Sequence, residues 1–183
     1  MSVGVLMVSR GAPRGGSLKG MYSVAEPNIL LTRIDNRLIH GQVVTQWNAV
    51  VGANLILVAN DGVAKSDVRQ RLMDMAAPEG VAMRYFSLQK TIDVIHQASS
   101  DQLIFLVADN PTDVLALVRA GVPIKKVNVG NMHMAEGRRQ VTASVAVDDT
   151  DVAAFKELRD LGVELEVQRV PSEPIEDSGV LFE

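Results

Sequence analysis

The sequence of 183 residues has no cysteine, few aromatic residues and no long apolar run. Without cysteine it forms no disulfide, carries no thiolate nucleophile and offers no cysteine-based zinc site, which is typical of a reducing compartment. No apolar stretch approaches the roughly 18 residues that would cross a bilayer. We therefore expect a cytoplasmic protein that reaches a membrane only through partner proteins.

Charge and aromatic content argue against nucleic acid as a partner. The net charge is -4, no block of like charges is present, and aromatic residues make up only 4% of the chain, which leaves few rings for base stacking. Hydrophobic residues make up 47%, enough for the core of one globular domain of this length. We expect one domain and no nucleic-acid partner.

The first 26 residues differ in composition from the rest. The stretch GAPRGGS at 11–17 has the composition of a linker. The apolar stretch at 3–8 is too short for the core of a signal peptide, and no basic segment precedes it. We expect residues 1–26 to be a disordered leader, or a segment foreign to the natural protein, and residues 27–183 to form the domain.

From residue 28 onward, short apolar runs alternate with amphipathic stretches. Runs of strand length occur at 28–34, 54–60, 81–86, 102–108, 125–130, 142–147 and 163–168, and helical patterns at 40–51, 64–77, 88–98, 112–120 and 149–161. This alternation predicts an α/β fold with an open, mainly parallel sheet of about seven strands and helices on both faces. Because no helix separates the run at 142–147 from the run before it, we expect one antiparallel pairing near an edge.

Sites in such sheets lie beyond the carboxyl ends of the strands. That rule groups the loops at 33–40, 60–65 and 130–138, which hold most of the polar residues of interest. A dinucleotide site would need G-x-G-x-x-G after the first strand, and RIDNRLIHG does not supply it. We expect no nicotinamide, no flavin and no other cofactor.

His40 lies near the predicted start of a helix, for which Asp35 or Asn36 is a plausible N-cap. The positive end of a helix dipole disfavours imidazolium, so the ring stays neutral and keeps a nucleophilic lone pair. Attack on phosphorus spreads charge over the equatorial oxygens, which fixed guanidinium groups stabilise well. Arg37, three residues earlier, and Arg33, at the strand end, are therefore candidates for phosphate binding.

The segment RIDNRLIHGQV resembles the signature of the IIB components of the mannose/fructose/sorbose family of the bacterial phosphoenolpyruvate-dependent sugar phosphotransferase system. The histidine of that signature carries the phosphoryl group. The similarity continues through LVANDGVAKSDVRQRLMDMAAPEGV and GVPIKKVNVGNMHMAEGRRQV, so it covers nearly everything from residue 27 onward. The stretches VNVGNMH and VPSEP resemble the N-acetylgalactosamine/galactosamine subgroup most.

The resemblance implies that His40 accepts phosphate from a phosphohistidine of a IIA protein, on Nδ1, and passes it to a sugar. The sugar, N-acetylgalactosamine or another hexose or amino sugar, is held by the membrane components IIC and IID, which would keep this chain at the inner face of the membrane. Arg37 matches the family arginine beside the histidine, and Arg69 matches a second phosphate-contacting arginine. Asp35 matches the family acid, for which we expect an orienting or capping role.

The remaining histidines are weaker candidates. His133 lies in a loop at the same predicted edge as His40 and is a candidate neighbour or docking residue, whereas His96 lies on a helix without polar company and is expected to be structural. The histidines lack short metal-ligand spacing, and no H-E-x-x-H is present. The acidic stretch DDTD at 148–151 predicts a helix N-cap rather than a metal site, so we expect no metal.

Two alternatives to a phosphocarrier stay open on the residues alone. One is a small-molecule α/β enzyme in which His40 is a general base and Arg37 holds a phosphate-bearing substrate. The other is a regulatory binding module without catalysis. A phosphohistidine that meets two partners in turn needs a flat or convex surface, so a deep pocket at His40 would favour the enzyme.

Overall fold

The computed structural model describes residues 26–183, and the prediction of a leader falls almost entirely outside this range. The strands are β1 (Asn28–Asp35), β2 (Leu55–Ala59), β3 (Ala82–Phe86), β4 (Leu103–Ala108), β5 (Lys126–Asn131), β6 (Arg139–Gln140), β7 (Ala146–Val147) and β8 (Glu164–Val167). The helices are α1 (Gly41–Val51), α2 (Asp61–Ala64), α3 (Asp67–Asp74), α4 (Leu88–Val94), α5 (Pro111–Arg119) and α6 (Asp149–Asp160), with 3-10 turns η1 (Ile95–Gln97) and η2 (Ser178–Phe182). No helix within this range is long and apolar enough to cross a membrane.

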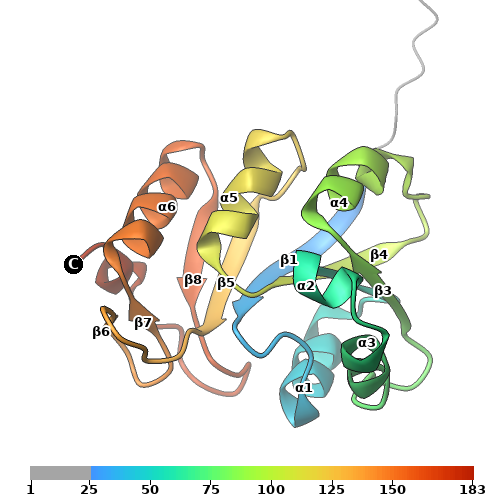
Figure 1. Cartoon of the computed structure of the whole chain (residues 1–183), viewed down its shortest axis with the longest axis horizontal. Helices are drawn as coiled ribbons and strands as arrows, with labels where there is room; N and C mark the ends of the chain where they lie inside the picture. Colours follow the sequence, from blue (N-terminus) through green and yellow to red (C-terminus); the bar gives the residue numbers. More distant parts are fainter. Residues whose placement is uncertain (1–25) are drawn as a thin grey trace, which may run out of the picture.

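Six strands form one sheet in the order β3-β2-β4-β1-β5-β8, and every pairing within it is parallel (Figure 1). Helices α4, α5 and α6 cover one face, and α1 and α3 cover the other. The α/β fold with a mainly parallel sheet and helices on both faces is confirmed. The chain leaves β1 toward one face, whereas it leaves the neighbouring β4 and β5 toward the other, so the carboxyl end of β1 is a topological switch point.

The segment 142–147, predicted as a strand of this sheet, is different. Within it, β7 pairs antiparallel with β6 in a separate two-stranded sheet, and Val145 forms only an isolated parallel bridge to Met132, so the main sheet has six strands rather than about seven. The amide groups of Val141 and Thr142 both donate to the carbonyl of Val145, at 2.9 and 3.1 Å. Backbone groups that are satisfied within a tight turn are not available to pair with a neighbouring strand.

The helix predicted at 64–77 is shorter and is formed by α3 at 67–74, and a separate short helix, α2, precedes it at 61–64. Asn60 caps α2 by accepting a hydrogen bond from the amide of Val63, and Ser66 caps α3 by accepting one from the amide of Arg69. Side-chain oxygens of this kind end one helix and begin the next, because they satisfy amide groups that have no partner inside the helix. The break at Ser66 sets where α3 starts and therefore where Arg69 lies.

Two apolar clusters hold the layers together, one on each face of the sheet. Phe155 of α6 packs in the cluster beneath α4, α5 and α6, and Trp47 of α1 packs in the cluster beneath α1 and α3. The predicted cap of α6 is confirmed: Asp148 and Asp151 form a reciprocal capping box. The loops at the carboxyl edge of the sheet are thus attached to strands and helices that pack into these two clusters.

Candidate functional site

The loop between β1 and α1 holds His40 in a fixed position. Leu38 donates its amide to the carbonyl of Asp35 at 2.8 Å and adopts φ of 57°, a left-handed conformation that costs a non-glycine residue about 1 kcal/mol or more. Leu38 and Ile39 are buried in the cluster beneath α1, which offsets that cost. The two residues before His40 therefore anchor it from the interior.

His40 is itself the N-cap of α1, which corrects the prediction that Asp35 or Asn36 caps this helix. Its backbone is extended, its side chain makes no capping hydrogen bond, and no acidic residue lies in the first turn. The first amide groups of α1 therefore receive neither a side-chain cap from His40 nor a nearby carboxylate. An uncapped start of an 11-residue helix is suited to an anion held close to His40.

Asp35 holds one nitrogen of the histidine ring. Nε2 of His40 lies 3.1 Å from Oδ2 of Asp35, and the His40 side chain is 21% exposed whereas that of Asp35 is 1% exposed. Burial raises the pKa of Asp35, but the hydrogen bond from His40 and the charge of Arg33 outweigh it, so the pKa lies below the ordinary value. An ionised carboxylate only accepts hydrogen bonds, so Nε2 carries the proton and a neutral ring keeps its lone pair on Nδ1.

Arg33 is buried, which corrects its prediction as a phosphate ligand. Its side chain is 3% exposed and donates to Asp35 Oδ2 at 2.9 Å, to Asn128 Oδ1 at 2.5 Å and to the backbone carbonyl groups of residues 168–169. The guanidinium carbon also lies 5.3 Å from the centre of the Trp47 ring. With both terminal nitrogens hydrogen-bonded and its side chain 3% exposed, Arg33 has no face left for a phosphate.

Arg37 and Arg69 are both exposed, at the carboxyl edge of the sheet. The backbone amide of Arg37 donates to Asp35 Oδ1 at 3.1 Å, and among the described residues its side chain has no hydrogen bond or ion pair. Nη1 of Arg69 lies 3.2 Å from where a Cβ on Gly62 would stand, so the guanidinium covers the start of α2, which follows β2 directly. Both arginines remain suited to bind an anion there.

Asn36 joins loops that the sequence did not link. Its Nδ2 donates to the carbonyl of Asp109 at 2.7 Å, and its Oδ1 accepts from the amide of His133 at 2.5 Å. Asn60 in turn donates to Oδ2 of Asp109 at 2.9 Å. The loops after β1, β2, β4 and β5 are therefore connected by hydrogen bonds, and His133 lies at the edge that carries His40, as predicted.

Asp109 and Asp113 form a carboxyl pair that sequence reasoning missed. Burial, followed by the charge of Asp109, raises the pKa of Asp113 to about 6. The signal was the strand-end rule itself, which applies to the loop after β4 as well as to the three loops selected. Within residues 26–183, no group of three or more histidine and acidic side chains is placed to hold a metal ion.

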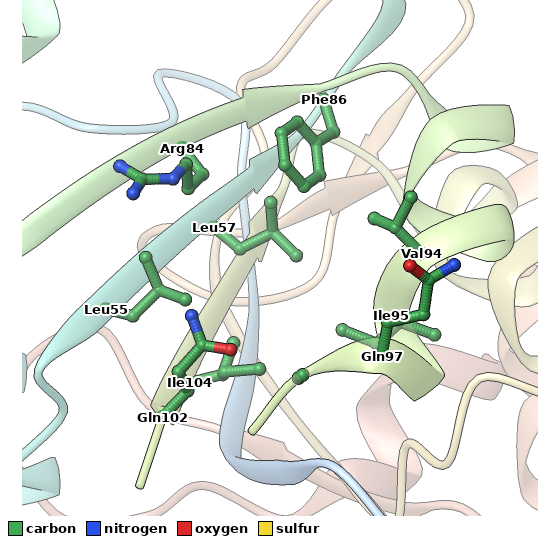
Figure 2. Close-up of a pocket in the computed structure, with 10 residues that line it drawn as sticks. Leu55, Leu57, Arg84, Phe86, Val94, Ile95, Gln97, Gln102 and Ile104 are labelled. Atoms are coloured by element: carbon green, nitrogen blue, oxygen red, sulfur yellow. The ribbon is translucent and has the colours of Figure 1, made fainter. Parts of the chain in front are cut away.

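A pocket of about 210 Å³ lies elsewhere, between the sheet and α4 (Figure 2). Leu55, Leu57 and Ile104 form its floor, from the first halves of β2 and β4, and Val94 and Ile95 face them across it. Its lining is mostly apolar and does not include His40 or either exposed arginine of the candidate site. This pocket gives no support to a small-molecule enzyme that uses His40.

Comparisons with known proteins agree with this geometry. Residues 29–183 match the family model of the PTS system sorbose subfamily IIB component. The chain is 55% identical over 151 residues to N-acetylgalactosamine-specific phosphotransferase enzyme IIB component 2 of Escherichia coli strain K12, covering 82% of this chain and 96% of that protein. It is 43% identical over 171 residues to the PTS system mannose-specific EIIAB component of the same strain, covering 89% of this chain and 53% of the relative.

A solved structure is similar over the same extent. The crystal structure of PTS system N-acetylgalactosamine-specific IIB component 1 from Escherichia coli superposes with a TM-score of 0.80 and 45% sequence identity. The match covers 82% of this chain and 99% of that one. The six-stranded parallel sheet and its flanking helices are therefore a fold already known from experiment.

Proposed function

The chain belongs to the sorbose subfamily of IIB components of the sugar phosphotransferase system, and on that premise we propose that His40 is the residue that carries the phosphoryl group. Membership makes the chain a phosphotransferase that passes a phosphoryl group from a IIA component to a sugar. The observation that carries the assignment to His40 is its partly exposed ring, held through Nε2 by a buried carboxylate at an uncapped helix start.

The proposed transfer from IIA is an in-line displacement at phosphorus. The Nδ1 lone pair of His40 forms the new P–N bond as the bond to the donor histidine breaks, and the electron pair of that bond returns to the donor ring. The ring of His40 then gains positive charge, and Asp35 stabilises it through Nε2–H. No general base is needed at this step, because the attacking nitrogen carries no proton.

Arg37 and Arg69 have separate tasks in this proposal. Arg37 is in the same loop as His40 and binds the oxygens of the transferring phosphoryl group, with the first amide groups of α1. Arg69 is supplied by α3 and contacts the phosphate from the side of β2. In the second transfer a sugar hydroxyl attacks the phosphorus, the P–N bond to His40 breaks with its electron pair returning to the ring, and a base in the membrane components takes the hydroxyl proton.

The proposed sugar is N-acetylgalactosamine or a closely related amino sugar. A relative that is 55% identical carries that specificity in its name. The proposed partners are a IIA protein as donor and the membrane components IIC and IID as the acceptor complex, with the chain at the inner face of the cytoplasmic membrane. A mannose-specific relative is named as an EIIAB component, which supports a IIA protein as the immediate partner.

The decisive experiment follows labelled phosphate from phosphoenolpyruvate through the general phosphotransferase proteins and a cognate IIA. We expect acid-labile, base-stable label on the wild type and none on His40→Gln. His133→Gln and His96→Gln are matched controls that should label normally. Label that persists on His40→Gln and disappears from His133→Gln would reject the assignment.

Sugar choice needs the membrane components. Vesicles with the cognate IIC and IID, supplied with phosphorylated protein, should phosphorylate N-acetylgalactosamine faster than mannose or sorbose. An equal or greater rate with mannose would reject the proposed sugar and leave the assignment of His40 intact.

A further inference from the structure

We propose that Arg33 is a positioning residue for phosphoryl transfer, which acts through the Asp35 oxygen that it shares with His40 and so holds the histidine proton on Nε2. This inference rests on the proposed function of His40. Arg33 reaches neither His40 nor the solvent-facing side of the ring. It acts through one residue, Asp35, and that residue is buried.

The shared oxygen is the central observation. Arg33 Nη2 lies 2.9 Å from Asp35 Oδ2, and His40 Nε2 lies 3.1 Å from the same atom. The other oxygen, Oδ1, accepts from the amide of Arg37 at 3.1 Å and from Nδ2 of Asn131 at 3.4 Å. With both oxygens engaged, the carboxylate has one orientation, and that orientation directs Oδ2 at the ring.

Arg33 is in turn held by a set of contacts that fixes its guanidinium group. Asn128 of β5 accepts from Nη1, the carbonyl groups of residues 168–169 accept from Nη1 and Nη2, and the Trp47 ring lies against the cation. A Cβ on Gly130 would lie 1.9 Å from Nη1, so β5 leaves room for the guanidinium only because this residue is glycine. The position of Arg33 is thus set by the sheet, by α1 and by the segment after β8.

The charge of Arg33 matters because Asp35 is buried. The described groups that face Asp35 are Arg33 from β1, His40 and the main chain of Arg37 from the loop, and the neutral amide of Asn131 from β5. Arg33 is the permanent cation among the side chains that bond to it. Without that charge, burial is opposed by less, so the pKa of the carboxyl group rises and the group takes up a proton at a higher pH.

A protonated Asp35 would reverse the hydrogen bond. Its O–H would donate to Nε2, which then accepts, so the neutral ring would carry its proton on Nδ1. The nitrogen proposed to attack phosphorus would lose its lone pair. Arg33 thus prevents the wrong tautomer without touching either substrate.

The test measures the tautomer and the pH profile of Arg33→Gln. Long-range ¹H–¹⁵N spectra, recorded as the pH is lowered, report which nitrogen of His40 carries the proton, and we expect the change from Nε2–H toward Nδ1–H to begin at a higher pH in Arg33→Gln than in the wild type. We also expect the rate of phosphoryl transfer from IIA to fall on acidification, and this fall, the acid limb of the pH profile, should lie about one pH unit higher in Arg33→Gln than in the wild type. The reason is that an adjacent opposite charge shifts a carboxyl pKa by about 1 to 3 units. Arg33→Lys, which keeps the charge, should restore most of the wild-type profile.

A matched control separates positioning from loss of stability. Val127→Ala removes core volume from β5 in the opposite cluster, beneath α5 and α6, and should lower stability without changing the tautomer or the acid limb. Should Arg33→Gln not fold, Asn128→Ala decides, because it removes a partner of Nη1 and keeps every charge. We expect the same changes in a weaker form, and a wild-type spectrum and profile would overturn the inference.

The two proposals fail in different ways. The spectra of His40 need no phosphoryl transfer. A folded Arg33→Gln protein with wild-type tautomer and pH profile would therefore reject the role of Arg33 and leave the proposed function of His40 intact. Absence of label on His40 in the wild type condemns the proposed function, whatever the spectra show.

Discussion

The guanidinium carbon of Arg33 lies 1.9 Å from the point where a Cβ on Gly130 would stand. A real Cβ never approaches another heavy atom so closely, so the arginine and a side chain at position 130 exclude each other. Arg33 of β1 pairs with Asn128 of β5, and Gly130 lies two residues further along the same strand. Each of the two residues therefore limits what the other can be.

This exclusion predicts the effect of Gly130→Ala. The new methyl group must displace a buried guanidinium, so we expect a loss of about 1 to 3 kcal/mol in the free energy of unfolding, the usual cost of overpacking. Urea unfolding of Gly130→Ala, Arg33→Ala and the double variant measures it. The double variant should lose less than the sum of the single losses by at least about 0.5 kcal/mol. Strict additivity would show that the two residues do not compete for space.

Arg37→Ala should impair transfer and leave stability nearly unchanged. The side chain is exposed and has no ion pair among the described residues, so its loss should alter the free energy of unfolding by no more than about 0.5 kcal/mol. Loss of one group that stabilises transition-state charge typically costs about 100-fold or more in rate. Rapid-quench measurement of transfer from IIA tests this, with Arg71→Ala, an exposed arginine on α3, as control. A normal rate in Arg37→Ala would remove Arg37 from the site.

Because Asp113 lies beside Asp109, we expect Asp113→Asn to stabilise the folded protein at high pH but not at low pH. The pKa of Asp113 rises from its ordinary 3.8 to about 6, so between these values the folded protein holds a proton that the unfolded chain has lost. Stability therefore decreases as the pH rises through this range. Asp113→Asn removes the penalty and should add about 1 kcal/mol at pH 8, after discount for partial exposure, and nothing below pH ~4. Urea unfolding at both pH values checks the sign, and an equal gain at both would contradict it.

Asn36 should control the order of the loop after β5. In Asn36→Ala the amide of His133 and the carbonyl of Asp109 both lose a partner, at a cost of about 1 kcal/mol each. Hydrogen exchange at the His133 amide should become faster in this variant. Asn36→Asp keeps the acceptor for that amide and should retain slow exchange. Equal exchange in all three proteins would show that this hydrogen bond does not hold the loop.

The sequence predicted the sheet and the histidine loop because their signals are local. Apolar runs of strand length, and glycine or proline after several of the helices, mark the elements of a parallel α/β fold. The structure also places the carboxylate of Asp35 in hydrogen-bond contact with the ring of His40. The motif places the two residues close together in the chain, so their contact needs little tertiary information.

The burial of Arg33 depends on groups that are distant in the chain. Strand alternation places it on the same face as Leu31 and Asp35, but that alone does not say what covers the end of the face. The cover comes from Trp47 and from the carbonyl groups of residues 168–169, which approach Arg33 only after β8 has joined the sheet. A pattern read along β1 contains none of this.

The prediction of a main-sheet strand at 142–147 was wrong for a related reason. These residues have strand propensity, yet hydrogen bonds within the turn at 141–145 satisfy the amide groups that would pair with a strand. The raised pKa of Asp113 was equally hidden, because it depends on burial beside Asp109 rather than on residue type. Where local preference and tertiary surroundings disagree, the surroundings decide.

Trp47 is the single tryptophan of the sequence, and it lies against the cation beside the proposed phosphohistidine site. Its indole N–H donates to the carbonyl of Arg169 at 3.2 Å, so the ring touches both the guanidinium and the segment that covers it. The tryptophan fluorescence of the protein therefore comes from one place. The molecule carries its own optical probe of that place, and no dye or added label is needed to follow it.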